Sequence, residues 1–307
     1  MAYIKDLLGI RYLCKTQLEL IFSAAAKAKQ SLALPGGKQG NSLNGCAAVL
    51  LFYENSTRTR VSFELAAKYT GAHAISVDSS ASSHAKGESL ADTGKTLERL
   101  HADVVIIRHS RSGAPHLLAK NVGASVINAG DGTNEHPTQA LLDAFTLLER
   151  FGSLNGLKVA IVGDIANSRV ARSNILALSM MGAKVWVYGP PTLLPQGIEQ
   201  LGASVAQSAE QALSGANAVM ALRIQRERQS CGYIPGLAEY AGRFGVNQYK
   251  MQLAAKDAVL MHPGPVNRDV ELSAQICDSD CSVIGTQVTN GLCVRMGLLH
   301  LLVNKLL

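Results

Sequence analysis

The sequence predicts an α/β protein made of two doubly wound parallel-sheet domains with helices on both faces. Strand and helix patterns alternate along nearly all of the 307 residues, which is typical of βαβ units and a parallel sheet. The strand candidates are short continuous apolar runs, as expected for strands buried on both faces. With 47% hydrophobic and 17% charged residues, the chain is globular and long enough for two ordinary cores.

The first half of the chain begins this alternation with a helix at 16–30. The apolar run at 47–53 then reads as a buried strand, and Val61, Leu65 and Tyr69 recur at helical spacing after it. These positions predict a helix at 57–70, which Gly71 ends. Further strands are expected at 74–77, 103–108 and 125–128, and helices at 90–100, 115–120 and 137–150, the last with proline in its first turn.

A second series follows the segment 151–156 (Phe-Gly-Ser-Leu-Asn-Gly), which is the best candidate for a hinge. Strands are expected at 158–162, 184–188, 218–222 and 258–261, with a helix at 170–181. A long apolar helix at 291–306 could cross back to the first domain. We therefore predict one domain at 1–150 with 288–307 packed on it, and a second at 151–287.

Composition excludes several classes of protein. The net charge of +6 comes from dispersed basic residues and aromatic content is only 5%, so a nucleic-acid interface is the weakest interpretation. The sequence contains no apolar run of membrane-spanning length and no signal peptide at its start. Six scattered cysteines fit a reducing cytoplasm, and Cys277 and Cys281 lack the further ligands of a metal site.

The most informative stretch follows the strand at 47–53. Ser56, Thr57, Arg58 and Thr59 stand where the next helix begins, and free backbone N–H groups and the positive end of the helix dipole meet there. Hydroxyls and an arginine complete a phosphate site without a glycine-rich loop. An ordinary helix cap with solvated arginines is the plain alternative.

Other strand ends carry similar groups, and ligands of open parallel sheets bind beyond the carboxyl ends of the strands. The polar residues at these further ends are Arg108, His109, His136, Gln139, Asp164, Asn167, Arg169, Arg223, Gln225 and Arg228. The set lacks an obvious nucleophile, metal ligands and paired acids, so it fits two polyanionic small molecules held against each other. Of the dinucleotide-binding glycine pattern only Gly163 is present, and no cofactor is expected.

Two motifs resemble those of the aspartate/ornithine carbamoyltransferases. The stretch 56–60 (Ser-Thr-Arg-Thr-Arg) resembles the family's carbamoyl-phosphate signature, and 136–139 (His-Pro-Thr-Gln) resembles its second motif. Three features favour the branch that acts on aspartate: 86–88 (Lys-Gly-Glu), 223–228 (Arg-Ile-Gln-Arg-Glu-Arg) and 262–265 (His-Pro-Gly-Pro). The resemblance runs over nearly the whole chain and implies carbamoyl transfer to aspartate, an early step of pyrimidine biosynthesis, with no covalent intermediate.

The resemblance also implies roles for single residues. Those for carbamoyl phosphate are Ser56, Thr57, Arg58, Thr59, Arg108, His136, Gln139 and the backbone carbonyls of Gly264 and Pro265. Those for aspartate are Lys86, Arg169, Arg223 and Gln225. Glu54 would align Arg169 and Arg228 when the domains close. Ser82 and Lys86 would reach a neighbouring subunit's pocket, so the active sites would be complete only in a homotrimer.

Departures from the family pattern are modest. Asn55 stands where many members have proline, and Ala85 where some have a second lysine. Regulatory or dihydroorotase chains, where present, would be separate polypeptides. Two alternatives stay open: a transcarbamylase acting on ornithine or a related amine, and a non-catalytic scaffold chain that binds carbamoyl phosphate.

Overall fold

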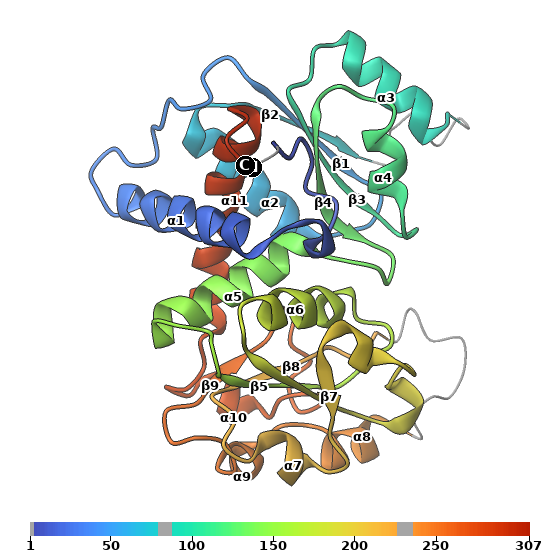
Figure 1. The fold of residues 1–307 in the computed structure, drawn as a ribbon, viewed down its shortest axis with the longest axis vertical. Coiled ribbons are helices and arrows are strands. Elements are labelled where there is room, and N and C mark those ends of the chain that lie inside the picture. Colours follow the sequence, from blue (N-terminus) through green and yellow to red (C-terminus); the bar gives the residue numbers. More distant parts are fainter. Residues whose placement is uncertain (1–2, 79–87, 226–235) are drawn as a thin grey trace. The chain divides into compact units, whose positions relative to one another are not determined.

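The computed structural model describes residues 3–78, 88–225 and 236–307 (Figure 1). The chain forms two compact units, Met1–Leu142 with Thr289–Leu307, and Asp143–Val288. The chain enters the second unit within helix α5 (Pro137–Phe151) and returns within α11 (Ile284–Val303). Each unit is built around its own parallel sheet, which confirms the predicted fold class.

The first unit contains the four strands β1 (Ala47–Phe52), β2 (His73–Asp78), β3 (Val104–His109) and β4 (Ser125–Asp131). All neighbours pair in parallel in the order β2-β1-β3-β4. Strands β1, β3 and β4 form from apolar runs that are largely buried, with every residue of β4 buried, whereas β2 at the sheet edge leaves Ile75 50% exposed. The sheet grows outward in opposite directions from β1 and β3, so a topological switch point lies between these two strands.

Helices cover both faces of this sheet (Figure 1). On one face, Leu97 of α3 (Leu90–Arg99) and Leu118 of α4 (Ala114–Ala119) pack into a core with strand residues such as Val105. On the other face lie α1 (Lys15–Leu32), α2 (Thr57–Thr70) and part of α11. Gly297 of α11 passes so close to α1 that an added Cβ would meet Ala24 at about 3 Å. The C-terminal helix is therefore an integral part of the first unit.

The second unit contains the five strands β5 (Lys158–Val162), β6 (Lys184–Tyr188), β7 (Ala203–Val205), β8 (Ala218–Ala221) and β9 (Val259–Met261). They pair in parallel in the order β7-β6-β5-β8-β9, which places a second switch point between β5 and β8. The helices of this unit are α6 (Arg169–Met180), α7 (Ala209–Leu213), α8 (Leu237–Arg243), α9 (Gln248–Met251) and α10 (Ala274–Cys277). Short 3₁₀ turns occur at Ile10–Tyr12 in the first unit and at Pro191–Leu193 and Ile198–Leu201 in the second.

Three details differ from the prediction. Strand β4 continues to Asp131 and does not end at 128, because Asp131 pairs with Glu135 across the following turn. Helix α11 begins at Ile284 and not at 291, since its first turns bury polar side chains such as Gln287 and carry no apolar period. The edge strand β7 and the short helices α7 to α10 were not predicted: β7 (Ala-Ser-Val) has no continuous apolar run, and each of these helices has seven residues or fewer.

Asp143 of α5 is a buried carboxylate on which the second unit depends. Asn174 Nδ2 of α6 and Gln287 Nε2 of α11 each donate to it at 2.8 Å. We expect Asp143→Ala to lower the free energy of unfolding by roughly 2–5 kcal/mol, because two buried amide donors lose their acceptor. Urea denaturation measures the loss. The exposed Asp278→Ala, which removes an ion pair to Arg268, serves as the control and should leave the midpoint nearly unchanged. Equal midpoints for both variants would contradict the assignment.

Candidate active site

The polar groups singled out in the sequence lie at the carboxyl ends of strands beside the two switch points. In the first unit they follow β1, β3 and β4, and in the second they follow β5, β8 and β9. Because all strands of a sheet are parallel, these ends share one edge, where open α/β sheets bind ligands. Each unit therefore presents a cluster of polar side chains at the edge where a ligand is expected.

The helix start after β1 has the geometry of an anion site. Ser56 is the N-cap residue of α2, and its side chain makes no capping hydrogen bond to the helix. Thr57 and Arg58 are exposed in the first turn, whereas Thr59 is buried. The Ser56 hydroxyl is thus not used as a cap, and it lies beside the positive end of a 14-residue helix.

Arg108 is held at the end of β3 by two neighbours. Its Nη2 donates to Glu54 Oε1 at 2.7 Å, and its Nη1 donates to the carbonyl oxygen of Ala129 at 3.3 Å. Both side chains of the ion pair are largely buried, at 12% and 24% exposed. Glu54 follows β1 and Ala129 belongs to β4, so three neighbouring strands fix one guanidinium at the switch point. The sequence had suggested only an alignment role for Glu54 toward Arg169 and Arg228.

His136 marks the start of α5 after β4. Its carbonyl oxygen accepts from the backbone N–H of Gln139 at 3.0 Å and of Ala140 at 3.3 Å, so it is the residue that caps the helix. The residue is only 4% exposed, and Gln139 is buried one turn away. The buried His136 therefore stands at the N-terminus of α5, where backbone N–H groups lack partners within the helix.

In the second unit, Asp164 joins the segments that follow β5 and β8. This fully buried carboxylate accepts from the backbone N–H of Asn167 at 3.1 Å and of Gln225 at 3.2 Å. Arg223 Nη2 in turn donates to Gln225 Oε1 at 3.1 Å. Arg169 is the first residue of α6 and is buried. Asp164 thus ties the backbone of Gln225 to the loop that leads from β5 into α6, and these two segments carry Arg223, Gln225 and Arg169.

Two tyrosines beside these loops have altered acidity. Burial, reinforced by the negative charges of Glu271 and Asp164, raises the pKa of Tyr240 far above its usual range. Burial also raises the pKa of Tyr53, which follows β1 and packs its ring against His109. Both phenols therefore stay neutral at physiological pH and act only as neutral hydrogen-bonding groups.

The turn after β9 is held by buried side chains. The backbone N–H of His262 donates to Gln287 Oε1 at 3.0 Å, and the N–H of Gly264 donates to His262 Nδ1 at 2.8 Å. His262 Nε2 lies 3.3 Å from Glu271 Oε1, with both side chains almost completely buried. The Gly264–Pro265 peptide is cis and Gly264 has a φ of 64°, a conformation that favours glycine. Hydrogen bonds to Gln287 and to the His262 ring thus anchor the backbone of this turn at His262 and Gly264.

The expected residues fall into two groups. The first unit holds Glu54, Ser56, Thr57, Arg58, Thr59, Arg108, His136 and Gln139, and the second holds Arg169, Arg223, Gln225, Gly264 and Pro265. Ser82, Lys86 and Arg228 lie outside the described residues. Sequence reasoning missed the supporting carboxylates Glu135 and Glu271, although an acid directly before the 136–139 motif was a signal.

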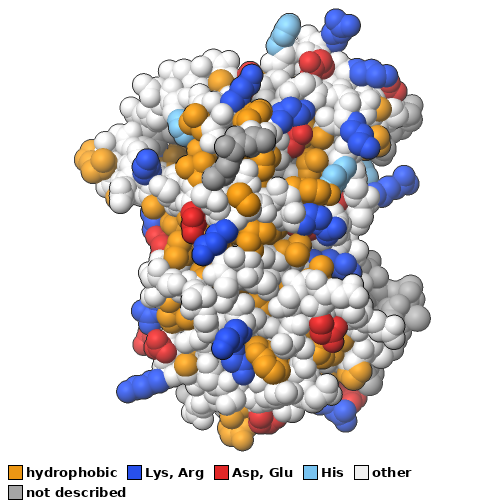
Figure 2. All heavy atoms as spheres, in the orientation of Figure 1, with side chains coloured by type: hydrophobic (Ala, Val, Ile, Leu, Met, Phe, Trp, Pro, Cys, Tyr) orange, Lys and Arg blue, Asp and Glu red, His pale blue; other side chains and the backbone are white. Residues whose placement is uncertain are grey.

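The distribution of charged side chains, the grouping of possible metal ligands and the apolarity of the helices bear on a basic patch, a metal site and a membrane span. Lys and Arg side chains on the face shown in Figure 2 stand singly or in small groups with Asp and Glu between them. Within the described ranges, three or more His, Cys, Asp or Glu side chains nowhere gather to hold a metal ion. Of the helices in the described part of the chain, none combines the length and apolarity needed to span a bilayer.

Comparison with known proteins decides the family. Residues 5–149 match the family model described as "Aspartate/ornithine carbamoyltransferase, carbamoyl-P binding domain", and residues 155–302 match "Aspartate/ornithine carbamoyltransferase, Asp/Orn binding domain". The chain belongs to the aspartate/ornithine carbamoyltransferase family. Among carbamoyltransferases, the aspartate carbamoyltransferase catalytic subunit of Acetivibrio thermocellus is 54% identical over 301 residues, covering 98% of this chain and 96% of that protein.

Solved carbamoyltransferase structures share the fold. Aspartate transcarbamoylase from Trypanosoma cruzi, in complex with carbamoyl phosphate and aspartate, is 28% identical with a TM-score of 0.87 over 96% of both chains. Ornithine carbamoyltransferase from Thermus thermophilus is also 28% identical with a TM-score of 0.87, over 98% of this chain and 100% of that one. The backbone alone therefore does not separate aspartate from ornithine enzymes.

Proposed function

We propose that this chain transfers the carbamoyl group of carbamoyl phosphate to the amine of L-aspartate, giving N-carbamoyl-L-aspartate and phosphate in pyrimidine biosynthesis. One observation carries the choice of aspartate over ornithine. The segments that follow β5 and β8 carry Arg169 and Arg223 and are tied together by the buried Asp164, and cations are the groups that a dicarboxylate needs. The 54% identity to an aspartate carbamoyltransferase catalytic subunit supports the same choice.

Carbamoyl phosphate binds to the first unit in this proposal. The hydroxyls and backbone N–H groups at the start of α2, together with Arg58, take the phosphate. Arg108, Thr59 and His136 donate to the carbonyl oxygen. The carbamoyl NH2 donates to Gln139 and to the backbone carbonyls of Gly264 and Pro265. Two observations support this assignment. The Ser56 hydroxyl makes no capping hydrogen bond to α2, and the Arg108 guanidinium at the end of β3 is held by Glu54.

Aspartate binds to the second unit. Arg169, Arg223 and Gln225 take its two carboxylates, and Lys86 of a neighbouring subunit contributes a further cation. Planar guanidinium groups suit carboxylates because they donate two parallel hydrogen bonds. The aspartate-binding domain is assigned to 151–287, and the carbamoyl-phosphate-binding domain to 1–150 with 288–307. Glu54 and Arg228 align the aspartate arginines.

The chemistry needs no enzyme nucleophile. The aspartate amine attacks the carbonyl carbon, the C–N bond forms, and the C–O bond to phosphate breaks with the amine proton passing to the departing phosphate. Alignment of two reactants can supply about 7–11 kcal/mol of the barrier reduction. Each donor on the developing oxyanion contributes roughly 2.7–4 kcal/mol more. Arg108, Thr59 and His136 are the donors assigned to that oxygen.

We further propose a homotrimer in the cytoplasm with shared active sites, in which Ser82 and Lys86 reach the neighbouring pocket. Five of the six cysteines lie in the described residues, and all five are free thiols, which is consistent with a reducing compartment. Regulatory or dihydroorotase chains, where present, are separate polypeptides. Analytical ultracentrifugation of the purified chain should give three times the 32.5 kDa chain mass. A stable monomer with full activity would contradict the shared sites.

A direct assay tests the reaction. The purified chain is supplied with carbamoyl phosphate and either L-aspartate or L-ornithine, and the carbamoylated product is measured. We expect carbamoyl aspartate only. Turnover of ornithine alone would identify the ornithine-type alternative, and binding of carbamoyl phosphate without turnover of either amine would identify a scaffold chain.

A further inference from the structure

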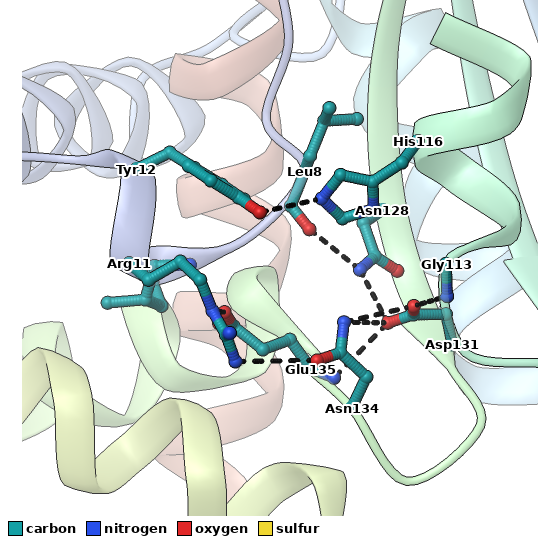
Figure 3. A network of polar contacts seen from close by, with 10 residues as sticks. Leu8, Arg11, Tyr12, Gly113, His116, Asn128, Asp131, Asn134 and Glu135 are labelled. Atoms are coloured by element: carbon teal, nitrogen blue, oxygen red, sulfur yellow. Dashed lines mark hydrogen bonds and ion pairs between the residues drawn. The ribbon is translucent and has the colours of Figure 1, made fainter. Parts of the chain in front are cut away.

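The turn that carries His136 is surrounded by a buried polar network (Figure 3). Asp131, at the end of β4, is fully buried, and its carboxylate accepts from Gly113 N at 2.7 Å and from Asn128 Nδ2 at 2.8 Å. It also accepts from the backbone N–H of Glu135 at 3.1 Å and from the side-chain amide of Asn134. Such a satisfied network fixes the geometry of the turn because every change leaves a buried polar group without a partner.

Glu135, the residue before His136, has a hydrogen-bond partner at its backbone N–H, its backbone oxygen and its carboxylate. Its backbone oxygen accepts from Asp131 N at 3.1 Å, and its N–H donates to the Asp131 carboxylate. Its own carboxylate accepts from the backbone N–H of Ile10 at 2.7 Å and from Arg11 Nε at 2.9 Å. Glu135 is 0% exposed. The residue that precedes the proposed oxyanion donor is therefore fixed on both its backbone and its side chain.

The partners of Glu135 come from an N-terminal segment that adds to the edge of the first sheet. Leu7 pairs in parallel with Ile127 of β4, with its N–H donating to Val126 O and its carbonyl accepting from Asn128 N, both at 2.9 Å. Asn128 Nδ2 also donates to the carbonyl of Leu8 at 2.9 Å. The segment then turns over the Glu135 carboxylate so closely that an added Cβ on Gly9 would collide with it. Residues 7–11 and the turn before α5 are therefore joined by a continuous set of hydrogen bonds.

We infer that Glu135 is a positioning residue that orients His136 for the reaction by tying its turn to the N-terminal segment. The inference rests on the proposed function in that His136 donates to the carbamoyl oxygen. Glu135 is bonded directly to His136 in the chain, whereas its hydrogen-bond partner Ile10 lies 125 residues away in the sequence. The contact is therefore a tertiary clamp and not part of a local turn. It assigns to residues 7–11 a part in catalysis that acts through Glu135.

Glu135→Ala tests the clamp. We expect kcat to fall about 10–100-fold, since a displacement of about 1 Å at a reacting group has effects of this size. The KM for carbamoyl phosphate should change less than about threefold, because the phosphate grip on α2 is untouched. Glu135→Gln keeps an acceptor for Ile10 N–H and should recover most of the lost rate. Gly9→Ala crowds the same carboxylate without removing it and should also lower kcat.

Asp6→Ala is the matched control. Asp6 also ties the N-terminal segment to β4, through a 2.8 Å hydrogen bond from Val126 N, but at the opposite end of the strand from His136. We expect this variant to lower thermal stability while kcat stays within about twofold of the wild type. An equal loss of kcat in Asp6→Ala and Glu135→Ala would overturn the inference, because general loosening of the segment would then suffice. An unchanged kcat in a folded Glu135→Ala would overturn it as well.

A spectroscopic readout separates the inference from the proposed function. Histidine labelled with ¹³C at Cε1 reports the ring environment of His136, whose resonance is assigned by its loss in His136→Gln. The resonance should shift or broaden in Glu135→Ala and stay in place in Asp6→Ala. An unmoved resonance in Glu135→Ala contradicts positioning whatever the enzyme's activity. If the wild type does not transfer the carbamoyl group, the proposed function is wrong. The His136 resonance in Glu135→Ala still tests whether Glu135 positions His136.

Discussion

Replacing Arg58 with alanine lowers kcat/KM for carbamoyl transfer by about 10²–10³-fold, the effect of removing one preorganised donor from a site of developing charge. Arg58 lies in the first turn of α2, exposed at the carboxyl end of β1. In the proposed mechanism the leaving phosphate gains charge as its bond to carbon breaks, and the Arg58 guanidinium and the N-terminus of α2 stabilise that charge together. Steady-state kinetics with each substrate varied in turn measure the loss.

The same helix provides the control. Lys68 is an exposed cation in the last turn of α2, so Lys68→Ala removes equal charge from the far end of the helix. We expect it to leave kcat/KM within about twofold, and both variants to change the free energy of unfolding by less than about 1 kcal/mol. Arg58→Lys should recover only part of the rate because lysine lacks the planar fork. A fully active Arg58→Ala would favour the scaffold alternative.

The sheets were largely predictable because parallel strands leave a strong mark on the sequence. Five of the six apolar residues of β1 are buried and the first, Ala47, is half-buried, so the strand is one uninterrupted apolar run. Strand β7 shows the limit of this signal, since it has three residues at a sheet edge and its middle residue, Ser204, is exposed. The start of α11 was lost for a related reason, because Gln287 and Asn290 are buried through hydrogen bonds and not through an apolar stripe.

The candidate site was predictable only where chemistry follows a strand directly. Arg108, His136 and Arg223 could be chosen because parallel strands deliver their carboxyl ends to one edge. Their supports could not, since contacts such as Arg11 to Glu135 and His262 to Glu271 join residues that no local period relates. These contacts depend on tertiary packing, which sequence spacing does not encode. The roles of all the site residues stay predictions, and Ser82, Lys86 and Arg228 also lie outside the described residues.

Arg223→Ala should act on the other substrate. Arg223 follows β8 and donates to Gln225 Oε1, and the backbone of Gln225 is fixed by the buried Asp164. Loss of two charge-assisted hydrogen bonds to a carboxylate costs roughly 3–6 kcal/mol, so kcat/KM for aspartate should fall at least about 10²-fold. The KM for carbamoyl phosphate should stay within about threefold, since its phosphate binds to the first unit.

The exposed Arg243→Ala, which breaks an ion pair with Glu239 in α8 of the same unit, is the charge-matched control and should leave both kinetic constants unchanged. Arg223→Lys should bind aspartate more weakly than the wild type, because a single ammonium cannot replace a fork that contacts a carboxylate and Gln225 at once. Equal losses for both substrates in Arg223→Ala would contradict the assignment of aspartate to the second unit. We expect Arg223→Ala to lose kcat/KM for aspartate selectively, and Arg58→Ala to lose activity that no aspartate concentration restores. Together these results would assign carbamoyl phosphate to the first unit and aspartate to the second. Neutralising the charge of the substrate in each unit would then be a separate requirement for the reaction.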